Sequence, residues 1–135
     1  MDIQGGCLCG AVRFHLKGRV NGFYFCHCSR CQKSSGSAHG SNLFFSDGVL
    51  VWEQGEDVCS DYEHKGTRFG KRFCTICASP LPRVIDVNNK LIQVPAGSLD
   101  GNDDFEPTAH LFIGDKKCWE DKLLQTKAFS SLPEQ

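Results

Sequence analysis

Seven of the nine cysteines in this chain lie in three short clusters, and this spacing constrains the fold more than any other feature. The clusters are Cys7-Leu8-Cys9, Cys26-His27-Cys28-Ser29-Arg30-Cys31 and Cys74-Thr75-Ile76-Cys77. Closely spaced cysteines in pairs are typical of zinc sites, where four thiolates close a structural site and three protein ligands leave one position open in a catalytic site. This spacing therefore predicts a fold in which thiols distant in sequence meet around metal ions.

The two outer pairs, Cys7/Cys9 and Cys74/Cys77, together supply four thiolates. We predict that they form one closed structural zinc site joining the N-terminus to the middle of the chain, because such a site can contribute folding free energy directly. Two alternatives remain at this stage. The pairs could be unrelated, or Cys74 and Cys77 could form a redox couple.

The middle cluster, Cys26, Cys28 and Cys31, has three sulfurs and no obvious fourth ligand. This pattern predicts a second, catalytic zinc with an open position, for which a small-molecule thiol is a suitable fourth ligand. The alternative is another closed site, completed by Cys59 or by a histidine. His27 alternates with Cys26 and Cys28, so on an extended backbone its side chain would point away from theirs.

Composition excludes several classes of protein. The formal charge is −1, and no basic residues cluster on a recognisable face, so we expect no nucleic-acid partner. No stretch approaches the ~20 apolar residues of a membrane span, and the first residues lack the pattern of a signal peptide. An odd number of cysteines also argues against a secreted disulfide framework, so we expect a cytoplasmic protein. At this length the chain is predicted to be one domain, residues 1–135.

The hydrophobic pattern predicts a mostly β fold with long cysteine-bearing loops and little helix. Residues 12–17 alternate apolar and polar side chains, as in a half-buried strand. Further strands are predicted at 43–45, 49–52, 57–62, 68–73, 91–94 and 109–113. Turns are predicted at Asn21-Gly22 and Asp47-Gly48, and a break in pairing at residues 80–82. One short helix is predicted around 119–124, and both tryptophans, Trp52 and Trp119, are predicted to be core residues.

Five sequence segments together resemble the glutathione-dependent formaldehyde-activating enzyme (GFA) family, which includes the centromere protein V domain. They are Gly6-Cys7-Leu8-Cys9-Gly10-Ala11-Val12-Arg13-Phe14, Cys26-His27-Cys28-Ser29-Arg30-Cys31-Gln32-Lys33, Arg72-Phe73-Cys74-Thr75-Ile76-Cys77-Ala78-Ser79-Pro80-Leu81, Gly97-Ser98-Leu99-Asp100 and Pro107-Thr108-Ala109-His110-Leu111-Phe112. The resemblance covers residues 5–133 and includes the order and spacing of all seven clustered cysteines. One departure is Ala78, where the family pattern usually has glycine, and it concerns the local turn geometry.

The resemblance implies a coiled arrangement of several β-sheets that is stabilised by zinc. It implies two Zn²⁺ per chain, a structural one at Cys7, Cys9, Cys74 and Cys77 and a catalytic one at Cys26, Cys28 and Cys31. It also implies a carbon–sulfur lyase like S-(hydroxymethyl)glutathione synthase, with glutathione and formaldehyde, or another small aldehyde, as its substrates. The resemblance names no residue as the proton donor.

Two other function classes are compatible with the same residues. One is a non-enzymatic zinc-binding interaction module of the centromere protein V type, and the other is a thiol-redox or metal-sensing protein. If glutathione is the ligand, basic groups should line its approach, and the candidates are Arg30, Lys33, Arg68, Lys71 and Arg72. For any one of them, a solvated surface charge is the more ordinary interpretation. His39 and His110 are predicted to be structural histidines, and Cys59 and Cys118 to be buried, inert thiols.

Overall fold

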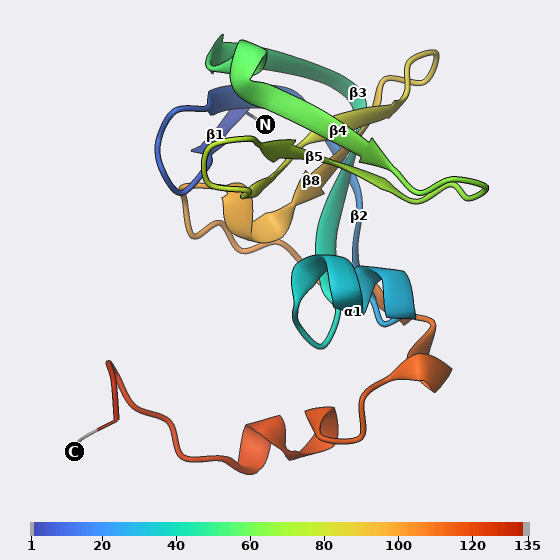
Figure 1. The fold of residues 1–135 in the computed structure, drawn as a ribbon, viewed down its shortest axis with the longest axis vertical. Helices are drawn as coiled ribbons and strands as arrows, with labels where there is room; N and C mark the ends of the chain where they lie inside the picture. Colours follow the sequence, from blue (N-terminus) through green and yellow to red (C-terminus); the bar gives the residue numbers. More distant parts are fainter. Residues whose placement is uncertain (1, 134–135) are drawn as a thin grey trace.

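A computed structural model describes residues 2–133, and its largest element is an antiparallel sheet with two long central strands (Figure 1). The strands of this sheet are β1 (Asp2–Gly6), β2 (Arg13–Cys26), β3 (Gly40–Gln54), β8 (Leu91–Pro95) and β7 (Arg83–Asp86), in the order β1-β2-β3-β8-β7. A sixth strand, β9 (Ala109–Leu111), pairs in parallel with the end of β2. The prediction of a mostly β fold with little helix is confirmed.

A second, three-stranded sheet carries the last cysteine pair. It consists of β4 (Cys59–Glu63), β5 (Gly70–Cys74) and β6 (Pro80–Leu81). The described helices are short: α1 (Ser29–Ser35) and the 3-10 helices η1 (Glu56–Val58), η2 (Ala96–Ser98), η3 (Ile113–Asp115) and η4 (Glu120–Gln125). Helix α1 begins directly after β2 and contains the last cysteine of the middle cluster, so the triplet lies at a strand-to-helix junction.

The core forms where alternating side chains of β2, β3 and β8 meet. Phe14 and Leu16 of β2 are fully buried, while the intervening His15 is half-buried and Lys17 is exposed, as the alternation predicted. Phe45 of β3 and Val94 of β8 are also fully buried. The buried Cys7 and Cys74 belong to the same cluster of core residues, so the predicted metal site lies against the core.

The two predicted turns are wrong, because both dipeptides lie inside long strands. At the first, Val20 pairs with Phe45 and Gly22 with Phe44, which leaves Asn21 as an extra residue in a bulge. The second dipeptide, Asp47-Gly48, also lies at an irregularity in the pairing of β3 with β2, and Asp47 has a positive φ of 51°. These bulges bend β2 and β3 without reversing them. The predicted break at 80–82 is also wrong in part, because Pro80 and Leu81 form the edge strand β6.

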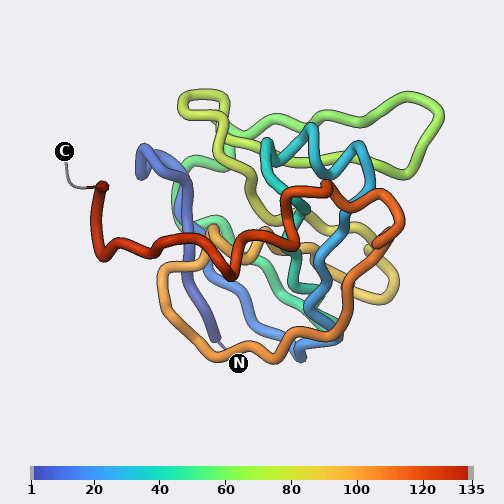
Figure 2. Tube along the Cα trace, turned by 90° about the horizontal axis from the view of Figure 1, so that it is seen from below, coloured from blue at the N-terminus to red at the C-terminus, as the bar shows by residue number. Residues whose placement is uncertain are grey.

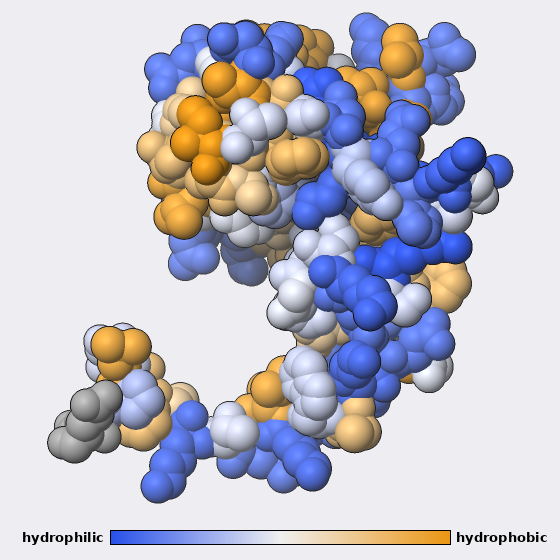
Figure 3. Space-filling model, in the orientation of Figure 1, coloured by the Kyte–Doolittle hydropathy of each residue, from blue (hydrophilic) through white to orange (hydrophobic). Residues whose placement is uncertain are grey.

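The chain after β9 runs past α1 and then away from both sheets (Figure 1), so that seen from below it passes in front of the rest of the chain (Figure 2). The helix predicted around 119–124 is present as η4, but it is a 3-10 helix and its apolar residues are exposed. Trp119 is 47% exposed, so its prediction as a core residue is wrong. Figure 3 shows apolar side chains exposed along this segment. Among residues 2–133, no helix has the length and apolar character needed to cross a membrane.

Candidate metal centres

The two outer cysteine pairs meet in one four-cysteine cluster. Cys7 and Cys9 come from the loop between β1 and β2, and Cys74 and Cys77 come from the end of β5 and the turn after it. All four sulfurs lie within 4.8 Å of one another, with 3.5 Å between Cys7 and Cys9 and 3.9 Å between Cys9 and Cys74. Four sulfurs at 2.3 Å around a tetrahedral zinc are about 3.8 Å apart, so this donor set fits the ion.

Backbone amides orient these sulfurs. The N–H of Val12 donates to Cys7 Sγ at 3.3 Å, and the N–H of Ile76 donates to Cys74 Sγ at 3.4 Å. In addition, the N–H of Leu8 donates to the hydroxyl of Ser79 at 3.1 Å, which joins the two loops directly. Because each loop also packs on the core, the four thiols are positioned by the fold from both sides.

The residue after the second cysteine of each pair has a left-handed backbone. Gly10 follows Cys9 and has a φ of 81°, and Ala78 follows Cys77 and has a φ of 63°. The Ala78 N–H closes its turn by donating to the carbonyl of Cys74 at 2.7 Å. Glycine adopts this conformation without steric cost, whereas alanine does not. The departure at Ala78 therefore falls on a strained position.

The thiols of this cluster differ in pKa. The Ser79 hydroxyl, 3.2 Å from Cys77 Sγ, is the main cause that lowers the pKa of Cys77 to about 5. The Ala11 amide lowers the pKa of Cys9, but the neighbouring Cys7 thiol and burial outweigh it and raise that pKa to about 11. Four adjacent thiolates repel one another, so deprotonating all of them requires a cation in their midst.

The middle cluster brings Cys26, Cys28 and Cys31 together at the junction of β2 and α1, with their sulfurs within 4.8 Å of one another. Cys28 caps α1, and its sulfur accepts the N–H of Cys31 at 3.4 Å. Burial alone would raise the pKa of Cys28, but the Cys31 amide and the two neighbouring thiols hold it below its usual value. Burial, followed by Cys26 and Cys28, raises the pKa of Cys31.

Among residues 2–133, no fourth cysteine, histidine or carboxylate side chain belongs to this group of three cysteines. Cys59 is not a fourth member, since it pairs with Cys74 across β4 and β5 and its thiol lies 3.5 Å from the carbonyl oxygen of Gly55. His27 is not one either, because its ring makes its hydrogen bonds elsewhere, to Phe25, Leu111 and Glu120. Neither Cys59 nor His27 therefore belongs to the triplet group.

Two cavities, of about 540 and 480 Å³, meet at Cys31. Four of the five predicted basic residues line them, together with one that the sequence did not single out, Arg83, which lines both. The basic lining residues are Arg30, Arg68, Lys71, Arg72 and Arg83. Lys33 is outside the lining.

The basic side chains differ in whether they form ion pairs with carboxylates of the chain. Arg72 donates to both carboxylate oxygens of Asp61, at 2.9 and 3.0 Å, and lies 5.5 Å from the Trp52 ring centre. Arg83 donates to the side-chain oxygen of Gln93 at 3.1 Å, and burial lowers its pKa. Among residues 2–133, Arg83 has no carboxylate within ion-pair distance. Asp61 and Glu63 act on it only through space, so its guanidinium can still pair with an anion in either cavity.

The remaining predicted residues have mixed outcomes. His39 lies beside the first cavity with its Nδ1 3.1 Å from the Ser41 hydroxyl, which fits the predicted structural histidine. His110 is exposed and packs its ring against Phe25 at 5.6 Å. The prediction that the two spare thiols are buried is wrong, because Cys118 is exposed and Cys59 is only partly buried.

Comparison with known proteins agrees with this arrangement. The family model described as "Glutathione-dependent formaldehyde-activating enzyme" matches residues 2–115, which include all seven clustered cysteines. The chain belongs to the GFA family. A Halomonas elongata protein, named provisionally as a glutathione-dependent formaldehyde-activating enzyme, is 29% identical over 144 residues, covering 100% of this chain and 91% of its own length.

A crystal structure of a Rhodobacter sphaeroides protein has a similar fold, with a TM-score of 0.58 at 18% identity. The similarity covers 80% of this chain and 99% of that one. For this GFA chain, the four-cysteine and three-cysteine clusters could each bind a metal ion, and their all-sulfur donor sets suit zinc.

Proposed function

We propose that this GFA protein is a zinc-dependent enzyme of the carbon–sulfur lyase type, acting on glutathione adducts of formaldehyde or another small aldehyde. The thiol would bind at the open three-cysteine site. The observation that carries the proposal is the position of Cys31, which belongs to the triplet and also lies where two cavities lined by basic residues meet. In this proposal Cys7, Cys9, Cys74 and Cys77 hold the structural zinc, and Cys26, Cys28 and Cys31 hold the catalytic one.

The cavity residues suit an anionic peptide. Glutathione carries two carboxylates and one amine, so a site that binds it needs cationic groups at a distance from the sulfur position. Arg83 lines both cavities and forms no ion pair within the described chain, and Lys71 donates to the carbonyl of Ser34 at 3.3 Å. These side chains would orient the peptide while the three cysteines face its thiol.

The reaction joins two small molecules. The glutathione sulfur forms a bond with the aldehyde carbon, and the carbonyl π bond breaks. The thiol loses its proton, and the aldehyde oxygen takes up a proton to become the new hydroxyl. Zinc, when bound, supplies the positive charge that favours a thiolate over a thiol at neutral pH. The residues of the chain hold the peptide and the aldehyde close together, which lowers the entropic part of the barrier. Reduced thiols are required throughout, which fits a cytoplasmic location.

Calorimetry with two ligands tests this proposal. Glutathione should bind the zinc-loaded protein with release of a proton, and more tightly as the pH rises towards the thiol pKa, near the ~8.5 reference value for cysteine. S-methylglutathione has the same charges but no ionisable thiol, so it should bind much more weakly. Measurements in two buffers of different ionisation enthalpy count the protons released. An exchange measurement should also show hydroxymethyl transfer faster than the uncatalysed background.

Two pairs of variants locate the site. Cys28→Ser should remove the difference between the two ligands, whereas Cys59→Ala should keep it. Arg83→Gln should weaken glutathione binding about three- to tenfold, because one partly exposed charged hydrogen bond is lost, and Arg19→Gln, on an exposed arginine paired with Asp47, should not. Equal affinity for both ligands without proton release would refute the proposal, and the triplet would then serve structure or partner binding.

A further inference from the structure

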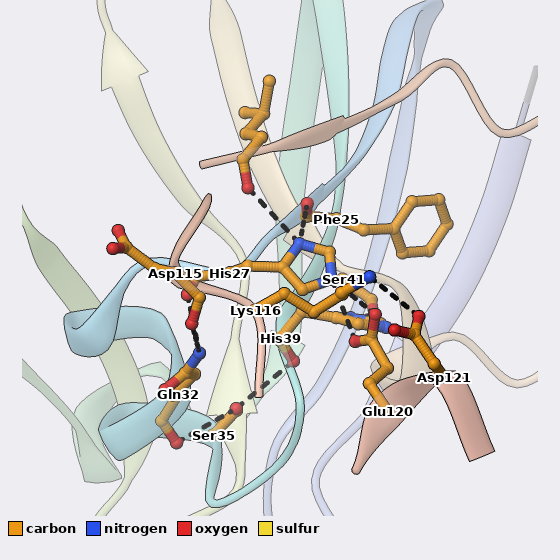
Figure 4. A network of polar contacts seen from close by, with 11 residues as sticks. Phe25, His27, Gln32, Ser35, His39, Ser41, Asp115, Lys116, Glu120 and Asp121 are labelled. Carbon is orange, nitrogen blue, oxygen red and sulfur yellow. Dashed lines mark hydrogen bonds and ion pairs between the residues drawn. The ribbon is translucent and has the colours of Figure 1, made fainter. Parts of the chain in front are cut away.

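A third group of ligand-type side chains lies outside both cysteine clusters. It consists of His27, His39 and Glu120, whose ligand atoms lie within 4.8 Å of one another. His27 follows β2, His39 precedes β3, and Glu120 begins η4, so three distant segments meet there (Figure 4). The family model ends at residue 115, so Glu120 comes from outside the matched region.

The hydrogen bonds of His27 fix where its ring protons can be. Its Nδ1 lies 3.1 Å from the carbonyl oxygen of Phe25 and 3.3 Å from that of Leu111. Carbonyl oxygens only accept hydrogen bonds, so Nδ1 carries a proton. The other nitrogen, Nε2, then faces the Glu120 carboxylate, at 2.9 and 3.2 Å from its two oxygens.

This arrangement needs a cation beside Nε2. A neutral His27 with its proton on Nδ1 would direct a lone pair at a carboxylate, inside a site where the imidazole is fully buried and Glu120 is 15% exposed. Two acceptors cannot face each other there without a cost in free energy. Lys116 acts on the Glu120 charge through space, but its ammonium hydrogen-bonds to Asp121, at 2.7 Å (Figure 4). A metal ion bound between Nε2 and the carboxylate would satisfy both acceptors.

His39 favours the metal ion. Its ring centre lies 5.0 Å from that of His27, and its ligand atom, unlike that of the equally close His110, completes a set of three donors with His27 and Glu120. Two histidines and one glutamate are a known ligand set for zinc. Both rings are also oriented as ligands usually are, through the nitrogen that does not bind the ion: His27 Nδ1 by backbone carbonyls and His39 Nδ1 by the Ser41 hydroxyl.

We propose that His27, His39 and Glu120 form a third metal site, which binds a divalent first-row transition ion through nitrogen and oxygen. The site shares no ligand with the cysteine clusters, so it does not depend on the proposed enzyme function. Because Glu120 belongs to η4, the bound ion would also attach the C-terminal segment to the end of β2. Nitrogen and carboxylate donors distinguish this site from the thiolate clusters, which prefer softer ions.

Cobalt titration of protein that carries two equivalents of zinc, one for each cysteine cluster, tests the site. Co²⁺ binds proteins more weakly than Zn²⁺, so it should add to the protein without displacing zinc from thiolates. We expect one further equivalent of Co²⁺, with visible d–d absorption and no sulfur-to-cobalt charge-transfer band. Glu120→Gln keeps the size of the side chain and can still hydrogen-bond to His27, yet it should weaken this equivalent at least about tenfold, and His39→Gln should do the same.

Matched controls make the result specific. Glu56→Gln and His64→Gln change the same residue types at exposed positions outside the cluster and should leave the third equivalent unchanged. Both test variants keep the buried His27, so the zinc content of the cysteine clusters should stay at the wild-type value. The proposal is overturned if no third equivalent binds, if the equivalent survives in both test variants, or if its spectrum shows sulfur ligation.

Discussion

Replacing Ala78 by glycine should stabilise this protein, although the change removes a methyl group. Ala78 has a φ of 63°, and its N–H donates to the Cys74 carbonyl at 2.7 Å, so the turn after Cys77 fixes it in the left-handed region. An L-residue with a Cβ pays about 1–2 kcal/mol for that conformation. Glycine does not, because its mirror-image conformations are about equally accessible.

The expected gain in the free energy of unfolding is smaller than the strain energy that is removed. Glycine also increases the conformational entropy of the unfolded chain, which costs about 0.4–1 kcal/mol. The difference is a net stabilisation of about 0–1.6 kcal/mol, with a central value of about 0.8 kcal/mol. For a chain of this size, that corresponds to a rise of about 2–4 °C in melting temperature.

Gly10→Ala provides the converse measurement. Gly10 occupies the equivalent place after Cys9, with a φ of 81°, and a Cβ added there would meet no heavy atom within 4 Å. This substitution therefore introduces the same strain without a clash, and it should destabilise by about 0.5–1 kcal/mol. Urea denaturation of both variants, at one fixed free zinc concentration, gives the free energies of unfolding under conditions where metal linkage is constant.

The double variant, Gly10→Ala with Ala78→Gly, should return close to wild-type stability. Its zinc content should equal that of the wild type, since neither position supplies a ligand atom. If Ala78→Gly destabilises the chain, or if Gly10→Ala has no effect, backbone strain does not limit these two turns and the reasoning fails.

Two further predictions concern the cysteines themselves. Cys77→Ser should unfold the chain or make it insoluble, because metal binding at the four-cysteine site supplies folding free energy. Cys28→Ser should stay folded, with zinc falling from two towards one per chain. Cys59→Ala is the control for both variants, and zinc analysis together with thermal melts distinguishes the outcomes. A melting temperature of Cys77→Ser equal to the wild type would contradict the assignment. Ser79→Ala removes the hydroxyl that contributes most to lowering the pKa of Cys77, so that pKa should rise and protons should compete with zinc at a higher pH. The pH of half-release of zinc, followed with a chromophoric chelator, should therefore move upward, and an unchanged value would refute the role of Ser79.

The seven clustered cysteines could be predicted as ligand groups because the information is local. Each pair places two sulfurs within a few residues, and that spacing has few uses other than binding a metal. The alternation in β2 was equally local, and its buried positions follow it. By contrast, Asn21-Gly22 is a strong turn signal that fails here, because the residues on either side continue to pair with β3 and the dipeptide is accommodated as a bulge.

Contacts between distant segments could not be predicted in the same way. Arg83 lines both cavities because β7 lies at the edge of the sheet, and nothing around it in sequence marks it as a binding residue. Glu120 reaches His27 across 93 positions, from a helix that sequence periodicity suggested only through its apolar residues. The core prediction for Trp119 fails for a related reason, since the C-terminal segment leaves the sheets instead of covering them.

The four-cysteine cluster shows how the two kinds of information combine. Strand register alone brings Cys59, and not another ligand, opposite Cys74. The sulfurs of Cys7 and Cys9 reach Cys74 only because the β1–β2 loop and the turn after β5 approach each other, with Ser79 and the Leu8 amide joining them. Local spacing therefore selects which thiols can share an ion, and the packing of two sheets against one core decides which of them do.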